Sequence, residues 1–430
     1  MKLKGWLAVM LICLCGSTLK AQKPVYRPLK VLFLGNSYTY VNSLPQVTAD
    51  IAASMGDSLT YDSNTIGGYT LQQHANDATS LAKIAAGDLD YVVLQEQSQW
   101  PSFPIEQVDT GMFPYAHFLD SLNHSYNTCG RSMFYMTWGR KNGDDLNCPT
   151  WPPVCTYEGM DSMLRLRYMM MADSNAAVLS PVGAVWHYIR QQYPAIELYQ
   201  ADESHPSPAG TYAAACAFYT ALFHKDPENI AYDYSLGATD AANIRHAAKV
   251  IVYDSMLYWH IGRYDPSAVF SYSTAAGNEV TFTNTSVNAT SYTWYFGDGD
   301  TATTASPVHT YTAPGAYTVM LVAHRCNDHD TFSMDISTWP AHTSTLQSGK
   351  GGMIISPNPA GNSISVQLPV AGQAAYDATI FNLQGVTVYK KALTSGKDYR
   401  IDISSLAPGF YILSLRSNDS SLWRGQFMKK

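Results

Sequence analysis

The sequence has few charged residues: they make up 14% of its 430 residues, against roughly one quarter in an average soluble protein. There are 27 Lys and Arg against 34 Asp and Glu, which gives a formal net charge of -7. Serine, threonine, asparagine and 30 tyrosines supply the polarity instead. Because no excess of basic residues is available to hold a phosphate backbone, we expect no nucleic-acid partner.

Long hydrophobic runs are also missing. An apolar run at residues 6–15 follows two lysines and is too short for a membrane-spanning helix, which needs about 20 residues. Small residues lead from it to Ala21, so residues 1–21 are predicted to be a signal peptide. Lipid attachment at Cys13 or Cys15 is disfavoured, because a bulky residue precedes each of them. No later segment is long and apolar enough to span a bilayer, so we expect no transmembrane segment.

The seven cysteines include no CxxC pair and no His/Cys cluster with zinc spacing, so neither a metal nor a cofactor is predicted. Cys148 and Cys155 enclose a proline-rich loop, NCPTWPPVC, and export favours a disulfide between them. Cys216 lies in the apolar run AAACAFYTALF and is expected to be a small buried hydrophobe. The sequence leaves the partner of Cys129 open.

Residues 28–264 alternate short apolar runs with amphipathic stretches. This alternation predicts a parallel sheet covered by helices on both faces, a three-layer α/β/α sandwich. The predicted strands are residues 30–34, 59–64, 91–95, 131–137 and 176–180, with a further candidate at 197–199. The predicted helices include residues 44–55, 71–86 and 160–174.

The composition changes after Pro266, where Thr-rich alternating segments predict short antiparallel strands. The segment WYFGDGDTATTASPVHTYTAPGAYTVMLVA resembles the polycystic kidney disease (PKD) repeat, a β-sandwich module. Trp294 can pack between the two sheets, and Gly297 and Gly299 permit a tight turn after its strand. Residues 266–340 are therefore assigned to a PKD-like β-sandwich.

A Ser/Thr/Gly-rich linker at residues 343–352 leads to a third region, residues 353–430. Turn residues separate alternating strands there, as in IISPNPAGN and SSLAPGFYILSL, which indicates a second small all-β sandwich. These segments resemble the C-terminal sorting domain of proteins exported by the type IX secretion system; the alternative is an ordinary accessory β-domain. The resemblance implies a type IX secretion partner and a secreted or outer-membrane surface-attached protein.

The first candidate for chemistry is Ser37. The segment KVLFLGNSYTY places it directly after a buried apolar strand and at the start of a helix. A serine there presents its hydroxyl at the carboxyl edge of the sheet, where α/β proteins build their sites. A helix N-cap would explain the same pattern, so Ser37 alone is weak evidence.

The second candidate is the pair Asp202 and His205, three residues apart on the loop YQADESHPSPAG before an apolar helix. A serine hydrolase needs a base to take the serine proton and a carboxylate to orient that base. An Asp-x-x-His turn supplies both groups. A polar loop with a capping aspartate is the alternative explanation of this pair.

Taken together, a strand-end Ser and a DxxH before the last helix resemble the SGNH/GDSL hydrolase family at both ends of the domain. The segment NTIGGYTLQQH places Gly68 where that family has a glycine whose backbone N–H faces the oxyanion. The segment YVVLQEQSQW ends where the family usually has Gly-x-Asn-Asp. The resemblance covers roughly residues 28–262 and implies a flavodoxin-like fold and ester hydrolysis.

This sequence departs from the family in two places. Asn36 replaces the Asp of Gly-Asp-Ser, which is not a triad member, and residues 95–98 replace the Gly-x-Asn block. A glutamine can donate an amide N–H as an asparagine does, so Gln95 or Gln97 would complete the oxyanion hole, and we choose Gln97. Glu96 is expected to be structural.

The resemblance thus implies a catalytic triad of Ser37, Asp202 and His205, and an oxyanion hole formed by Ser37, Gly68 and Gln97. The substrate is expected to be a small-molecule or polysaccharide ester, with an O-acetyl group on a carbohydrate as the first hypothesis. The alternatives are a lipase and an inactive surface glycan-binding protein.

Several other residues invite a functional interpretation. Trp138, in MTWGR at a strand end, is a weak candidate for a substrate contact. Asp298 and Asp300 could bind calcium, although a turn after a strand explains both. The single histidines on helical segments are expected to be structural; these are His74, His187, His224 and His260.

Overall fold

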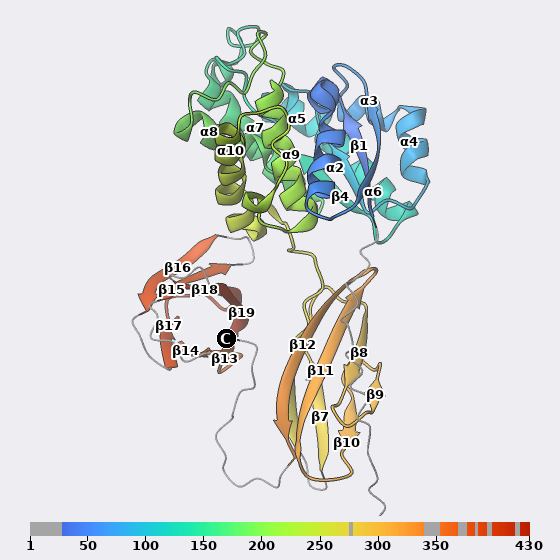
Figure 1. The fold of residues 1–430 in the computed structure, drawn as a ribbon, viewed down its shortest axis with the longest axis vertical. Coiled ribbons are helices and arrows are strands. Elements are labelled where there is room, and N and C mark those ends of the chain that lie inside the picture. The colour runs from blue at the N-terminus through green and yellow to red at the C-terminus, as the bar shows by residue number, and fades with distance from the viewer. Residues whose placement is uncertain are drawn as a thin grey trace, which may run out of the picture.

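The structure, a computed structural model, describes residues 28–274, 278–338, 353–368, 376–382, 386–393, 398–417 and 422–430. The predicted signal peptide and the predicted linker at residues 343–352 lie outside the described residues. Figure 1 shows an α/β domain followed by two β-domains.

The α/β domain is built on a five-stranded parallel sheet with the strand order β2-β1-β3-β4-β5. This is the flavodoxin-like order, in which the chain starts in the middle of the sheet and sites form at the carboxyl ends of the strands. The strands are β1 (Leu29–Gly35), β2 (Leu59–Thr65), β3 (Tyr91–Leu94), β4 (Arg131–Tyr135) and β5 (Val178–Ser180).

Helices cover both faces of this sheet, as the sequence predicts. One layer contains α2, α8, α9 and α10, which pack against one another, and the other contains α3 to α7. In the first layer, α9 is the most apolar helix. It is buried along almost its whole length, which matches its alanine-rich sequence. The helices are α1 (Ser37–Tyr40), α2 (Leu44–Ser54), α3 (Leu71–Ala75), α4 (Ala78–Ala85), α5 (Ile105–Gly111), α6 (Phe113–Tyr126), α7 (Tyr157–Ser174), α8 (Val182–Gln192), α9 (Pro208–Phe223) and α10 (Ala238–Ile251).

Two predicted elements differ from the structure. The predicted helix at residues 71–86 is two helices, because the Asp77 side chain accepts the Ser80 N–H and starts α4 as its N-cap. The candidate strand at residues 197–199 is not part of the sheet. Tyr199 instead forms an isolated bridge with Pro206, which closes the loop that carries the DxxH pair.

The second domain is a sandwich of two antiparallel sheets, with the orders β10-β7-β6 and β12-β11-β8-β9. Trp294 is fully buried between them, together with Phe282 and Leu321, as expected from the sequence. The strands are β6 (Phe270–Thr274), β7 (Glu279–Asn284), β8 (Ser291–Tyr295), β9 (Thr301–Ala302), β10 (Val308–Thr310), β11 (Ala316–Arg325) and β12 (Asp328–Ser337).

The third domain is also a pair of antiparallel sheets, β13-β14-β17 and β16-β15-β18-β19. Its own core includes Ile364, Ile380 and Leu413. The predicted fold class, an α/β sandwich followed by two small all-β sandwiches, is therefore confirmed. The strands are β13 (Ile354–Ser356), β14 (Ser363–Gln367), β15 (Tyr376–Asn382), β16 (Thr387–Leu393), β17 (Asp398–Asp402), β18 (Gly409–Ser417) and β19 (Leu422–Lys429).

The first two domains are covalently joined. Cys129, just before β4, forms a disulfide with Cys326, in the turn between β11 and β12. Beside it, the Arg131 guanidinium pairs with Asp265 at 2.5 Å and with Asp328 at 2.6 Å. Because β4 begins at Arg131, this junction lies at the amino edge of the sheet, away from its carboxyl edge.

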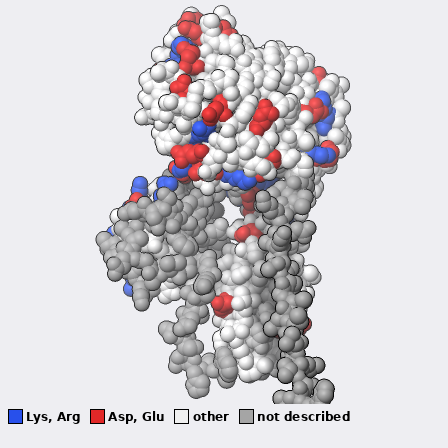
Figure 2. All heavy atoms as spheres, in the orientation of Figure 1, with Lys and Arg blue, Asp and Glu red and all other residues white. Residues whose placement is uncertain are grey.

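The surface reflects the low charge content. On the face shown in Figure 2, the Lys, Arg, Asp and Glu side chains of the α/β domain are scattered over a largely uncharged surface. Within the residues that the structure describes, no helix is both long and apolar enough to cross a membrane.

Candidate active site

The turn after β1 presents Ser37 at the carboxyl edge of the sheet. Ser37 is the first residue of α1, and the Asn36 side chain caps this helix by accepting the Tyr38 N–H at 3.1 Å. A Cβ atom at Gly35 would lie 2.5 Å from Thr39 Oγ1 and 2.6 Å from Gln95 Oε1. Glycine is therefore favoured before the turn, because the hydrogen-bonded side chains of Thr39 and Gln95 occupy the space that a Cβ atom would need.

Gln95 holds this turn from the end of β3. Its Oε1 atom accepts the Asn36 N–H and the Thr39 hydroxyl, each at 2.9 Å. Its Nε2 atom donates to Asn36 Oδ1 at 2.9 Å and to the Glu96 carbonyl at 2.5 Å. Gln95 is fully buried and its amide is fully occupied, so it is no free oxyanion donor. The sequence identified Gln95 only as a possible donor and missed this positioning role.

Three side chains form a hydrogen-bonded series at the edge of the sheet. The Ser37 hydroxyl lies 2.8 Å from His205 Nε2, and His205 Nδ1 is hydrogen-bonded to Asp202. With Nδ1 protonated toward the carboxylate, Nε2 is free to accept the serine proton. The series is open to solvent, since the side chains of His205 and Asp202 are 32% and 47% exposed.

Asp202 is held in its ionised form. Burial opposes ionisation, but hydrogen bonds from the His205 ring and from the backbone N–H groups of His205 and Ser204 outweigh it and lower the pKa of Asp202. The carboxylate therefore stays charged at neutral pH, as an orienting group for a histidine base requires.

The loop that follows β4 donates hydrogen bonds to the DxxH loop. The Trp138 indole N–H donates to the Ser204 carbonyl at 3.1 Å, and the Lys141 N–H donates to the Glu203 carbonyl at 2.9 Å. The Asn142 amide donates to the Glu203 carboxylate at 2.8 Å. These contacts fix the backbone on either side of the catalytic turn.

The structure does not support Trp138 as a substrate contact, because its side chain is fully buried. The indole is stacked between Tyr38 and Trp186, with ring centroids 4.6 and 3.7 Å apart. Trp138 therefore links the nucleophile turn to the DxxH loop from inside the core.

The two further oxyanion candidates lie on loops that are tied to the nucleophile turn. Gly68 has φ = +75°, and its loop is joined to the turn because the Asn36 amide donates to the Tyr69 carbonyl at 3.0 Å. The Gln97 amide nitrogen donates to Ser98 Oγ at 3.3 Å and to Gln99 Oε1 at 3.2 Å. Both contacts are at the long end of the hydrogen-bond range, so the amide nitrogen can give them up and donate to a better acceptor.

Glu96 connects these two loops. Its fully buried carboxyl group accepts the Leu71 N–H at 3.1 Å and the Gln97 N–H at 2.6 Å. Burial raises its pKa to about 8, against the opposing effect of the two N–H donors. Glu96 thus has the structural surroundings that the sequence analysis expected.

Other polar groups lie outside the triad. His74 is buried and hydrogen-bonds the Gly35 carbonyl at 3.0 Å and Ser80 Oγ at 2.9 Å, which fits a structural role. Cys148 and Cys155 form a disulfide, and Cys216 is a buried free thiol.

In the second domain, Asp298, Asp300 and His309 each offer an atom within 4.8 Å of the others. His309 is already hydrogen-bonded to Asp298 at 2.7 Å. A separate groove of about 720 Å³ between β1, β2 and α4 contains none of the triad residues.

The arrangement is that of a serine nucleophile with a His–Asp base on an α/β sandwich. Residues 265–337 match the PKD domain model, and residues 355–429 match the model of a secretion system C-terminal sorting domain. The resemblances noted for these two regions in the sequence are therefore confirmed, and the sorting domain supports secretion or surface attachment. No curated protein matches the chain.

Solved structures that are similar to this chain include three that match its α/β region. A DUF4886 family protein from Bacteroides uniformis shares 17% identity, with 54% of this chain and 96% of that one covered and a TM-score of 0.46. A candidate SGNH hydrolase from Slackia heliotrinireducens shares 25% identity, with 45% and 98% covered and a TM-score of 0.37. An esterase from a Pseudoalteromonas species shares 13% identity, with 45% and 97% covered and a TM-score of 0.33.

Proposed function

We propose that this protein is a secreted serine esterase that cleaves an ester through an acyl-enzyme. The observation that carries the proposal is the continuous series of hydrogen bonds from Ser37 through His205 to Asp202. The sorting domain supports export. The same proposal includes a signal peptide at residues 1–21 that is cleaved on export, and a mature protein without a membrane span.

In the first half-reaction, His205 Nε2 takes the proton of Ser37 as Oγ forms a bond to the ester carbonyl carbon. The carbonyl oxygen becomes an oxyanion, and Asp202 stabilises the imidazolium. The tetrahedral adduct then collapses, the alcohol oxygen leaves, and His205 gives it the proton. The acyl group remains on Ser37.

In the second half-reaction, His205 takes a proton from water as the water oxygen attacks the acyl carbon. Ser37 Oγ leaves with the proton from His205, and the carboxylic acid is released. The backbone N–H groups of Ser37 and Gly68, with the Gln97 amide, are proposed to hold the oxyanion in both steps. Each such donor contributes about 10²–10³ in rate.

The proposed substrate is a short-chain ester, with an O-acetyl group on a carbohydrate as the first choice. Bulky side chains next to the nucleophile support a small acyl group. Tyr38 is buried and its ring centroid lies 5.5 Å from that of His205, and Thr39 is buried beside it. A long acyl chain would contribute about 0.8 kcal/mol for each methylene that it buries, so the dependence of rate on chain length distinguishes a deacetylase from a lipase.

The decisive experiment is hydrolysis of p-nitrophenyl acetate, butyrate and octanoate by the wild type and by Ser37→Ala, His205→Ala and Asp202→Asn. We expect Ser37→Ala to abolish hydrolysis, His205→Ala to be nearly as severe and Asp202→Asn to be milder, while circular dichroism stays unchanged. Activity of Ser37→Ala within tenfold of the wild type would remove the esterase proposal. Octanoate as the best substrate would replace the deacetylase with a lipase that uses the same triad.

A further inference from the structure

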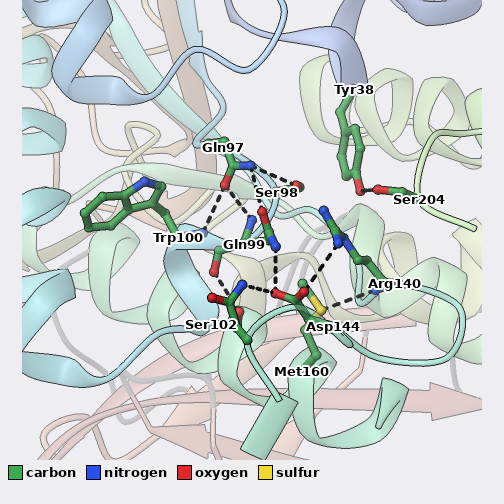
Figure 3. A network of polar contacts seen from close by, with 11 residues as sticks. Tyr38, Gln97, Ser98, Gln99, Trp100, Ser102, Arg140, Asp144, Met160 and Ser204 are labelled. Carbon is green, nitrogen blue, oxygen red and sulfur yellow. Dashed lines mark hydrogen bonds and ion pairs between the residues drawn. The ribbon is translucent and has the colours of Figure 1, made fainter. Parts of the chain in front are cut away.

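A polar network beside the triad connects the loop after β3 to the loop after β4. The Arg140 guanidinium pairs with Asp144 at 3.3 Å, and the other Asp144 oxygen accepts the Gln99 amide at 2.7 Å. Gln99 is in turn hydrogen-bonded to Gln97, the proposed oxyanion donor. Figure 3 shows this series of contacts from Gln97 to Arg140.

Asp144 fixes the position of Arg140 without using most of its donors. The Asp144 carboxylate is fully buried and also accepts the Asn147 amide at 2.6 Å, so it cannot follow the guanidinium outward. Of the three guanidinium nitrogens of Arg140, only Nη1 has a hydrogen-bond or ion-pair partner among the described residues. The Nη2 group therefore keeps both of its N–H donors on a side chain that is 30% exposed.

Arg140 lies next to the catalytic residues. Its charge acts on the hydroxyl of Tyr38, where burial raises the pKa and the guanidinium opposes that rise. The Tyr38 hydroxyl is hydrogen-bonded at 2.6 Å to Ser204, the neighbour of His205 in the chain. In Figure 3 the end of the Arg140 guanidinium points into the space between Ser98 on one side and Tyr38 and Ser204 on the other.

We propose that Arg140 binds a carboxylate on the substrate, so that the esterase acts on acylated compounds that bear an acid group, such as an O-acylated uronic acid. This inference rests on the proposed function and names the substrate class of the same site. A guanidinium held by one buried carboxylate offers its remaining donors in a fixed geometry, which suits a carboxylate better than a neutral hydroxyl.

Asp144 does not cancel this preference. It contacts Arg140 through one oxygen only, and its other oxygen accepts two amide donors, from Gln99 and Asn147. Other acidic groups on the neighbouring loops have partners of their own: Asp202 and Asp161 are paired with His205 and His187, and Glu203 accepts the Asn142 amide. The Nη2 group thus faces the site as a cation with unfilled hydrogen-bonding capacity.

The test compares two substrates that differ only in charge: the methyl glycoside of O-acetyl-galacturonic acid, whose carboxylate is free, and the carboxamide of the same glycoside. For the wild type we expect kcat/KM to be about tenfold higher for the carboxylate, because a charge-assisted hydrogen bond is at stake. In Arg140→Gln this ratio should fall to about one, and Arg140→Lys should keep part of it. Lys141→Gln is the matched control, because it removes the neighbouring positive charge, which pairs with Glu197, and should leave the ratio intact.

The outcomes separate this inference from the esterase proposal. If p-nitrophenyl acetate is hydrolysed in a Ser37-dependent manner but the wild type shows no preference for the carboxylate, the Arg140 inference is wrong and the esterase stands. If no ester is hydrolysed, calorimetric titration of the full chain with the methyl glycoside of galacturonic acid and with its carboxamide decides. Binding of the acid that is lost in Arg140→Gln upholds the carboxylate site, and equal binding of the two ligands overturns it.

Discussion

The polar residues that follow β3 have different environments although their side chains are chemically similar. Gln95 is buried and holds the turn that carries Ser37, and Glu96 is buried and joins two loops. Gln97 is half-buried, and its amide nitrogen donates only two long hydrogen bonds. Neighbouring residues in an extended segment point to opposite sides, which puts Gln95 and Gln97 on one side and Glu96 on the other, so the difference between Gln95 and Gln97 lies in their burial. Substitutions at these positions should therefore have different effects.

Gln95→Leu and Gln97→Leu form a matched pair. Gln95→Leu leaves the buried Asn36 N–H and Thr39 hydroxyl without their acceptor, so we expect a loss of about 2–6 kcal/mol of stability, at about 1–3 kcal/mol for each buried donor. Gln97→Leu should cost less stability, because it removes an acceptor only from the N–H groups of Gln99 and Trp100 in a half-buried loop, and it should lower kcat by about 10²-fold. Thermal denaturation and steady-state kinetics of both variants check this, and the reverse pattern would exchange the two roles.

Glu96 should make stability depend on pH. Its folded-state pKa of about 8 lies above its ordinary value of 4.5, so between these values the folded protein binds more protons than the unfolded chain. The free energy of unfolding should therefore fall as pH rises through this window, by at most about 1.4 kcal/mol per pH unit from this group.

Glu96→Gln cannot titrate and removes this contribution. Its amide nitrogen would also face one of the two N–H donors, so the variant should be less stable than the wild type at pH 5. The difference in thermal midpoint between wild type and variant should narrow from pH 5 to pH 8. A difference that stays constant over this range would show that Glu96 does not titrate there.

At the scale of elements, the site depends on two loops that meet at the carboxyl edge of the sheet. The loop after β4 is hydrogen-bonded to the loop between α8 and α9 through Trp138 and Lys141. These two loops are neighbours because the sheet order places β4 next to β5, and β5 leads into α8 and the loop after it. The geometry of the His–Asp pair is therefore set by a loop that has no catalytic residue of its own.

Trp138→Phe tests this support. Phenylalanine keeps the stacking between Tyr38 and Trp186 but loses the N–H that donates to the Ser204 carbonyl. We expect kcat to fall about tenfold with KM nearly unchanged, because the base is displaced while the substrate surface is intact. Trp186→Phe is the control. It keeps an aromatic ring against Trp138, and the indole N–H that it removes donates to the Gly210 carbonyl and not to the DxxH loop. An unchanged kcat for Trp138→Phe would show that the bond to Ser204 is not needed.

At the scale of the whole molecule, the PKD domain is fixed to the α/β domain at the edge of the sheet opposite to Ser37, His205 and Asp202. The Cys129–Cys326 disulfide and the Arg131 ion pairs with Asp265 and Asp328 join them. Part of this junction is buried, since the Arg131 side chain is only 19% exposed. The PKD domain is therefore attached at the amino edge of the sheet, and Ser37 lies at its carboxyl edge.

The double variant Cys129→Ser/Cys326→Ser should unfold at a midpoint several degrees lower. The disulfide closes a loop with a sequence separation of 197, for which the chain-entropy model gives about 5 kcal/mol as an upper bound. Catalysis at 25 °C should be unchanged, because the junction and the triad lie at opposite edges of the sheet. Calorimetry and p-nitrophenyl acetate kinetics check both statements, and a large loss of kcat would indicate coupling between the domains.

The sequence alone determined the alternation of strands and helices, the two β-sandwich modules and the catalytic candidates. Local pattern suffices for these, because Ser37 follows its strand directly and Asp202 and His205 share one turn. Only the tertiary structure decided the roles of Gln95 and Gln97, the buried position of Trp138, the partner of Cys129 and the place of Arg140 beside Tyr38. These depend on which strands are neighbours and which way each side chain points, and segments that meet across a sheet leave no spacing signal in the chain.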